Sequence, residues 1–246
     1  MRKAVNKMKI SVCIPMYNES AIIADTARTL DEYMKKSFGE GEYEIIFSDD
    51  GSRDGSGDIV RGLGLTGVKV VGYEVNKGKG CAVRTAMLQA EGDVVMFTDA
   101  DLAYGTEVIR RVYDALTADA EADMLIGSRN MSKDGYESYS LLRKIASKIY
   151  IKVLCIAGGF KLSDSQCGCK AFKLDAVKKI FPRCEVNGFA FDFEAILWAT
   201  KMKMKIIEMP VKVINMGDSK VRIIRDTLKM LRDLRKMRKR IAKTDV

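Results

Sequence analysis

Strand-like and helix-like patterns alternate along the first half of the chain. Residues 9–15 have the apolar character of a buried strand, and Ile22, Ile23, Ala27 and Leu30 then recur at helical spacing. A strand followed by a helix is predicted three more times: strand 43–48 with helix 53–61, strand 68–73 with helix 80–90, and strand 93–98 with helix 107–116. A further strand is predicted at residues 124–126. This alternation predicts an α/β fold, with a mostly parallel central sheet flanked by helices.

The pattern changes after Arg129. Residues 139–156 read as one helix, on which Arg143 and Ser147 are four residues apart and therefore share a face. From residue 221 to 241, apolar residues recur every three or four positions and most basic residues lie between them, which predicts an amphipathic C-terminal helix. We expect one main domain over residues 1–218 and a helical tail over 219–246.

The positive charge of the chain lies in this tail. Residues 219–246 contain eleven Lys or Arg and three acidic residues, whereas the whole chain has a net charge of +9. A basic amphipathic helix is typical of an anchor on an anionic membrane surface, and a helix that binds nucleic acid or a partner protein is the alternative. The low aromatic content of 8% argues against nucleic acid.

Composition excludes several kinds of chemistry. There is no histidine, so Ser-His-Asp and Cys-His catalysis and His-containing zinc sites are excluded. The six cysteines are scattered, and Cys167 and Cys169 lack the spacing of a zinc or redox motif, so we expect reduced thiols. We find no signal peptide and no membrane-spanning segment in the sequence. We therefore expect a cytoplasmic protein, peripheral on the cytoplasmic face of a membrane.

Polar or glycine-containing segments follow five of the predicted strands. The carboxyl ends of parallel strands meet at one edge of a sheet, where open α/β sheets bind their ligands. Five such segments at one edge predict a nucleotide or phosphate site, and they lie at residues 15–19, 49–52, 76–80, 99–101 and 127–129.

Asp99 and Asp101 form the most informative of these segments. Residues two apart on an extended backbone point to the same side, so two carboxylates would project together from the end of a buried strand. Such a pair suits Mg²⁺ or Mn²⁺ bound jointly with substrate phosphates, although a polar turn is the alternative. Gly78-Lys79-Gly80 is no Walker A loop, but a lysine at a helix start favours an anion. Asp49 and Asp50 equally fit a helix N-cap.

Taken together, these segments resemble the inverting family-two glycosyltransferases with the GT-A fold. The resemblance is greatest to the branch that glucosylates or mannosylates dolichyl and other polyprenyl phosphates, and it extends from Ser11 to about Leu234. It rests on the order of the motifs at residues 11–19, 49–52, 76–80, 99–101, 127–129, 164–168, 191–194 and 217–221.

The resemblance implies a role for each of the following residues. Pro15, Tyr17, Glu19 and Asp50 would line the nucleoside pocket, Lys79 and Asp99 would lie near the base or ribose, and Asp101 would be the principal metal ligand, with Asp99 beside it. The leaving diphosphate would be covered by Ser219 and Lys220. The lipid phosphate would be held by Arg129, Arg143 and Ser147. Asp192 occupies the position of the base in relatives with hydroxyl acceptors. Arginine suits bidentate phosphate contacts, while a solvated basic face is the alternative.

The implied activity is metal-dependent, inverting transfer of a hexose from a nucleotide-diphosphate sugar to a polyprenyl phosphate. Mannose synthases of this branch tend to carry Gln where this chain has Ala103, so this chain lacks a third protein ligand to the metal that the resemblance would otherwise imply. The Gln-Cys-Gly segment at residues 166–168 is similar to the glucosyl branch, which favours UDP-glucose over GDP-mannose. Two alternatives remain: transfer to a glycan or protein hydroxyl with Asp192 as base, and a non-catalytic nucleotide-sugar-binding scaffold at a membrane. Many relatives carry transmembrane helices after this domain, so a separate membrane subunit is a further candidate partner.

Overall fold

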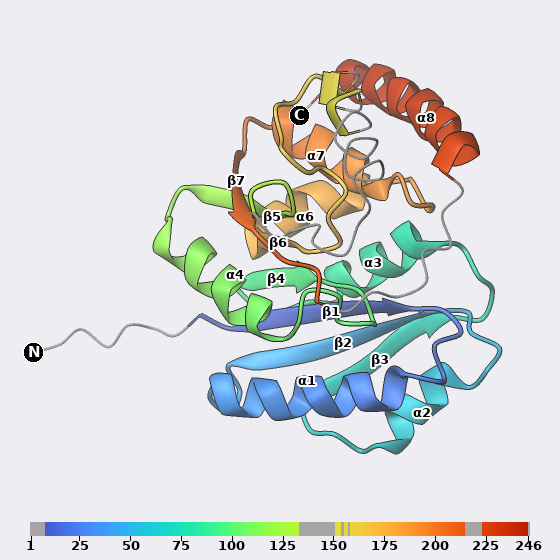
Figure 1. Ribbon diagram of the computed structural model, residues 1–246, viewed down its shortest axis with the longest axis vertical. Coiled ribbons are helices and arrows are strands. Elements are labelled where there is room, and N and C mark those ends of the chain that lie inside the picture. Colours follow the sequence, from blue (N-terminus) through green and yellow to red (C-terminus); the bar gives the residue numbers. More distant parts are fainter. Residues whose placement is uncertain (1–7, 133–150, 154, 157, 215–222, 246) are drawn as a thin grey trace, which may run out of the picture.

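The structure, a computed structural model, describes residues 8–132, 151–153, 155–156, 158–214 and 223–245, with only the backbone for 223–231. Within these residues seven strands form one sheet in the order β3-β2-β1-β4-β6-β5-β7 (Figure 1). The strands are β1 (Ile10–Met16), β2 (Tyr43–Asp50), β3 (Val68–Tyr73), β4 (Val94–Phe97), β5 (Ala122–Ser128), β6 (Lys170–Lys173) and β7 (Lys205–Pro210).

All neighbouring strands except β6 pair in parallel. β6 lies between β4 and β5 and is antiparallel to both, so β4 and β5 still run in the same direction. The carboxyl ends of β1, β2, β4 and β5 therefore open on the same edge of the sheet, as the strand–helix alternation predicts.

Helices cover both faces of the sheet (Figure 1). Strand residues alternate between the two apolar clusters that result: Val12 and Ile14 face one, and Cys13 between them faces the other. Burial on both faces explains why the strands read as nearly continuous apolar runs. One face carries α1 (Ile23–Ser37), α2 (Ser56–Gly62) and α4 (Glu107–Ala118), and the other carries α3 (Lys79–Leu88), α6 (Leu174–Ile180), α7 (Phe191–Lys201) and part of α8 (Ile223–Lys243).

The α/β fold and every strand and helix predicted up to residue 126 are confirmed, with boundaries shifted by a few residues. Residues 151–153 and 155–156 are helical, in agreement with the end of the helix predicted over 139–156. The sequence did not reveal β6, α6, the short 3-10 helix Phe181–Arg183, α7 or β7. β6 is only four residues long with a lysine at each end, and α7 is buried on nearly all sides, so neither shows an amphipathic period.

The C-terminal helix is confirmed as α8, but it is not a free tail. Leu234, Met237 and Ile241, which follow each other at spacings of three and four, are at most 4% exposed and belong to the same apolar cluster as α7. The expectation that the apolar face of this helix enters a membrane is therefore wrong for these three residues, because the globular core already buries them. This half of α8 packs against the main domain, and the division of the chain at residue 218 stays a prediction.

Polar contacts hold the same half of α8 in place. Lys201 Nζ at the end of α7 donates to the carbonyl oxygens of Ile241 and Ala242, at 2.6 and 3.0 Å, and so satisfies acceptors at the end of α8. Arg240 forms ion pairs with Glu194 and Glu185. None of the described helices combines the length and apolar character needed to cross a bilayer. All six cysteines are free thiols, as the sequence predicts.

Candidate active site

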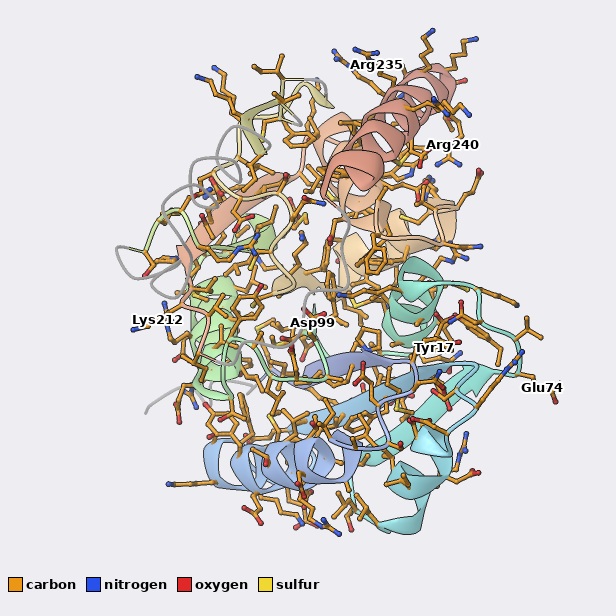
Figure 2. All side chains as sticks on the ribbon, turned by 45° about the vertical axis from the view of Figure 1, so that its right-hand side comes forward. Tyr17, Glu74, Asp99, Lys212, Arg235 and Arg240 are labelled. Carbon is orange, nitrogen blue, oxygen red and sulfur yellow. The ribbon has the colours of Figure 1, made fainter. Side chains whose placement is uncertain are left out.

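The loops that follow β1, β2, β4 and β5 gather at the carboxyl edge of the sheet. Asp99 follows β4 near the middle of the molecule, and Tyr17 follows β1 (Figure 2). Strand β1 is buried along its whole length, Pro15 included, whereas Tyr17 just beyond it is 40% exposed. Of these two predicted nucleoside-pocket residues, Tyr17 thus presents its ring at the surface and Pro15 supports the strand beneath.

Lys79 forms an ion pair with Asp99. Its ammonium group donates to Asp99 Oδ1, and the two side chains are 28% and 29% exposed. Burial alone would lower the pKa of Lys79, but the negative charge of Asp99 outweighs that effect and raises the pKa. The preceding Gly78 has φ +107°, a conformation that suits glycine, and it places Lys79 at the first residue of α3. The structure thus brings these two predicted residues together.

Asp101 lies beside this pair. Its Oδ1 accepts a hydrogen bond from Ala103 N at 3.0 Å, and burial together with the charge of Asp99 raises the pKa of its carboxyl group. Two carboxylates that repel each other in a partly buried loop are a fitting donor set for a divalent cation, which would relieve the repulsion. No group of three or more metal-binding side chains occurs in the described part of the chain. Substrate oxygens and water would therefore have to complete the coordination.

Gly168 packs directly on Asp99. A Cβ atom at Gly168 would overlap Asp99 Oδ2, and Gly168 N donates to Tyr104 Oη at 3.0 Å. The glycine of the 164–168 motif is therefore explained by close approach of the backbone to the Asp99 carboxylate. Its role in shaping this loop was not evident from spacing alone.

Asp50, at the end of β2, is 3% exposed and its carboxylate is fully used inside the protein. It accepts hydrogen bonds at 2.7–3.0 Å from Tyr73 Oη, Asn76 Nδ2, Lys77 N and Gly78 N. Because a carboxylate accepts about four hydrogen bonds, Asp50 organises the loop that leads into Lys79. A direct contact of Asp50 with a nucleoside stays a prediction.

Glu19 lies in the loop after β1, which is tied to the loop after β2. Glu19 N donates to Ser56 Oγ at 2.9 Å, Asn18 N donates to Ser52 Oγ at 3.0 Å, and Arg53 N donates to Asn18 Oδ1 at 2.9 Å. These contacts fix the backbone around Tyr17 and Glu19. They support a preformed surface next to the Lys79–Asp99 pair.

Arg129, predicted to hold the acceptor phosphate, forms a bidentate ion pair with Asp164. Its Nε and Nη2 donate to the two carboxylate oxygens at 2.6 and 3.0 Å, and the Asp164 side chain is fully buried. The structure therefore shows a partner within the protein for this guanidinium, and phosphate binding by Arg129 stays a prediction. Arg143, Ser147, Ser219 and Lys220 lie outside the described residues.

Asp192 lies near the start of α7 and is 8% exposed. Its Oδ1 accepts a hydrogen bond from Lys170 Nζ at 2.8 Å, and the Lys170 side chain is completely buried. Burial raises the pKa of Asp192, while the positive charges of Lys170 and Lys79 oppose the rise. The sequence analysis did not identify Lys170, whose only signal was a lysine within the apolar stretch from Cys169 to Phe172.

Comparison with known protein families identifies one match. The model described as "Glycosyl transferase family 2" matches residues 11–181, which is more than half of the chain and includes every described site residue except Asp192.

Two curated relatives carry the name dolichyl-phosphate beta-glucosyltransferase. The protein of Dictyostelium discoideum is 30% identical over 234 residues, which cover 89% of this chain and 70% of that protein. The protein of Saccharomyces cerevisiae is 28% identical over 229 residues, which cover 86% of this chain and 68% of that protein. The chain thus spans about two thirds of the length of these relatives.

Solved structures share the fold. Glucosyl-3-phosphoglycerate synthase from Mycobacterium tuberculosis in complex with UDP superimposes with a TM-score of 0.68 at 17% identity, over 97% of this chain and 82% of that one. A second structure of that protein, with Mn²⁺, UDP and glucosyl-3-phosphoglycerate, gives a TM-score of 0.65 at 18% identity, over 97% and 81%. The architecture of this chain is that of the GT-A glycosyltransferases.

Proposed function

Because the chain belongs to glycosyl transferase family 2 and is a glycosyltransferase, we propose that it transfers a hexose from a nucleotide-diphosphate sugar to a polyprenyl phosphate. Glucose from UDP-glucose is the favoured donor, and mannose from GDP-mannose is the alternative. The observation that carries this proposal is the group formed by Asp99, Asp101 and Lys79 at the carboxyl edge of the sheet. The names of the curated relatives support the acceptor.

A divalent cation held by Asp101 and Asp99 would supply positive charge for the diphosphate of the donor, as the Mn²⁺ and UDP in the solved relative suggest. Tyr17 offers an exposed ring for the nucleoside. Lys79 fixes the position of the Asp99 carboxylate, and Asp50 fixes the loop before Lys79. These residues hold the site in shape before the substrate arrives, which is the largest contribution that a protein makes to such transfers.

The acceptor chemistry is simple for a phosphate monoester. A phosphate oxygen attacks the anomeric carbon from the side opposite the leaving group, one C–O bond forms, and the bond to the nucleoside diphosphate breaks with inversion. Since the second pKa of a phosphate monoester is about 6, the attacking oxygen is already anionic near neutral pH. This acceptor needs no general base, so Asp192 would not have to deprotonate it.

Donor and acceptor can be tested separately. The donor test is a thermal-shift panel of UDP-, GDP-, dTDP- and CDP-sugars with and without Mn²⁺, in which we expect a metal-dependent shift with UDP-glucose. The acceptor test compares transfer of labelled glucose to farnesyl phosphate and to farnesol. Transfer to farnesyl phosphate alone supports the proposal, whereas transfer only to hydroxyl acceptors would contradict it and assign the base role to Asp192.

We further propose that the exposed basic residues of α8 bring the enzyme to the cytoplasmic face of an anionic membrane. Arg235, labelled in Figure 2, and the neighbouring Lys236 are both exposed on the half of α8 that packs on α7. Each Lys or Arg near an anionic surface contributes about 1 kcal/mol. The double variant Arg235→Gln/Lys236→Gln should therefore sediment less with phosphatidylserine vesicles than Lys178→Gln/Lys179→Gln, its control on α6. Equal sedimentation of the two variants would contradict this part of the proposal.

A further inference from the structure

Lys170 is a fully buried lysine with three contacts. Its Nζ donates to Asp192 Oδ1 at 2.8 Å and to the carbonyl oxygen of Cys167 at 2.6 Å, and it lies 5.8 Å from the centre of the Phe97 ring. The residue has no exposed surface. Burying a lysine is costly unless its charge is compensated, and here Asp192 supplies the compensating charge. Because burying an ion pair costs desolvation free energy, the position of this pair in the fold can point to its role.

The pair lies next to the catalytic loops. Lys170 is the first residue of β6 and is paired in the sheet with Phe97, which is two residues before Asp99. Phe97 also packs on Phe191, the neighbour of Asp192, with ring centres 5.4 Å apart. The other charged groups that act on Asp192 are Lys79 and Asp99. Asp192 therefore lies close enough to the Lys79–Asp99 pair for both charges to act on its carboxyl group.

A backbone contact holds the start of α7 against the start of α3. Gly80 N, at the start of α3, donates to the carbonyl oxygen of Asn187 at 2.8 Å, and a Cβ atom on Gly80 would lie 2.6 Å from Phe191 Cβ. The start of α7, with Asp192, is thus packed tightly against the start of α3, with Lys79. This contact holds the backbone next to Asp192 at its place beside α3.

An ionised Asp192 in this place would repel an anionic acceptor. We propose that Lys170 is a positioning residue that acts through Asp192: it holds this carboxylate in place as half of a neutral pair, so that the site admits a phosphate acceptor. This inference rests on the proposed function, because it concerns the acceptor of the same reaction. It adds a residue that sets the class of acceptor, and it explains why an acidic side chain can remain beside an anionic substrate.

The test is the binding of farnesyl phosphate, measured by calorimetry at pH 8.5 without donor or metal, with farnesol as the uncharged comparison. The alkaline pH favours the ionised form of the Asp192 carboxyl group in every variant. Lys170→Met should weaken binding of farnesyl phosphate about tenfold or more and leave farnesol unaffected, because one unit of negative charge is then uncompensated. Lys173→Met is the matched control: Lys173 ends the same strand, and its Nζ donates to the carbonyl oxygens of Asp119 and Ala120.

The double variant Lys170→Met/Asp192→Asn separates this role from a structural one. It is neutral like the wild-type pair, so its affinity for farnesyl phosphate should return to within about threefold of wild type. If Lys170→Met does not fold, the double variant alone still decides, since a loss of tenfold or more in it would overturn the inference. Equal weakening in the single and double variants, or none in the single one, would also overturn it. Failure of the wild-type protein to prefer farnesyl phosphate to farnesol would instead overturn the proposed acceptor itself.

Discussion

Glu44 lies at the amino end of β2, and Asp101 lies beyond the carboxyl end of β4. The surroundings of these two acidic residues shift their pKa values in opposite directions. Glu44 is 7% exposed, and its carboxylate accepts hydrogen bonds from Ser11 Oγ at 2.6 Å and Glu91 N at 2.8 Å and pairs with Lys69 at 2.9 Å. Burial would raise the pKa of Glu44, but these partners outweigh burial and lower it.

At the carboxyl ends the balance is reversed. Burial raises the pKa of both Asp101 and Asp192, and in each case the charge of Asp99 adds to the rise. The groups around Glu44 favour its charged form, whereas burial and the charge of Asp99 disfavour the charged forms of Asp101 and Asp192. Carboxyl groups whose pKa is raised and that gather at one edge of the sheet are candidates for a functional site.

The largest effect should come from Asp101→Asn. We expect a loss of glycosyl transfer of about 100-fold or more, because the variant removes one charge of the candidate cation site. The matched Glu44→Gln variant should keep its activity per folded molecule. Steady-state transfer rates of the two purified variants check this, and similar losses in both would remove the distinction between the two ends of the sheet.

A smaller effect should follow from Gly168→Ala. The added methyl group would overlap Asp99 Oδ2 and displace this carboxylate, so we expect activity to fall by about 10- to 100-fold with little change in the melting temperature. Gly188→Ala is the control, because a Cβ atom there would meet nothing within 4 Å. Unchanged activity in Gly168→Ala would show that the position of Asp99 is not critical.

The smallest effect should be the stability change in Glu44→Gln, and it should depend on pH. Because the pKa of Glu44 is lower in the folded protein than its usual value of 4.5, its contribution is complete above about pH 4.5 and is lost as the pH falls through the folded value. The variant should thus be about 1–3 kcal/mol less stable at pH 7, and the difference should shrink below pH 4.5. Urea unfolding at several pH values measures this, and a difference that is independent of pH would contradict it.

The sequence predicted the first half of the fold well because β1 to β5 and their helices are long enough to show clear periods. It also predicted that Asp99, Asp101 and Lys79 meet, since parallel strands end at one edge. It could not predict that β6 inserts antiparallel between β4 and β5, and so it did not place Lys170 beside Asp192. Likewise, amphipathic spacing cannot tell whether Leu234 and Ile241 face a membrane or another helix, and the structure shows that they face α7.

The measurement that tests the central claim most directly is transfer of labelled glucose from UDP-glucose to farnesyl phosphate, with and without Mn²⁺, by the wild type, Asp101→Asn and Glu44→Gln proteins. We predict a metal-dependent glucosyl phosphate product with inverted configuration, formed by the wild type and Glu44→Gln and nearly absent for Asp101→Asn. Equal product from all three proteins, or none from the wild type with any nucleotide sugar, would contradict the account.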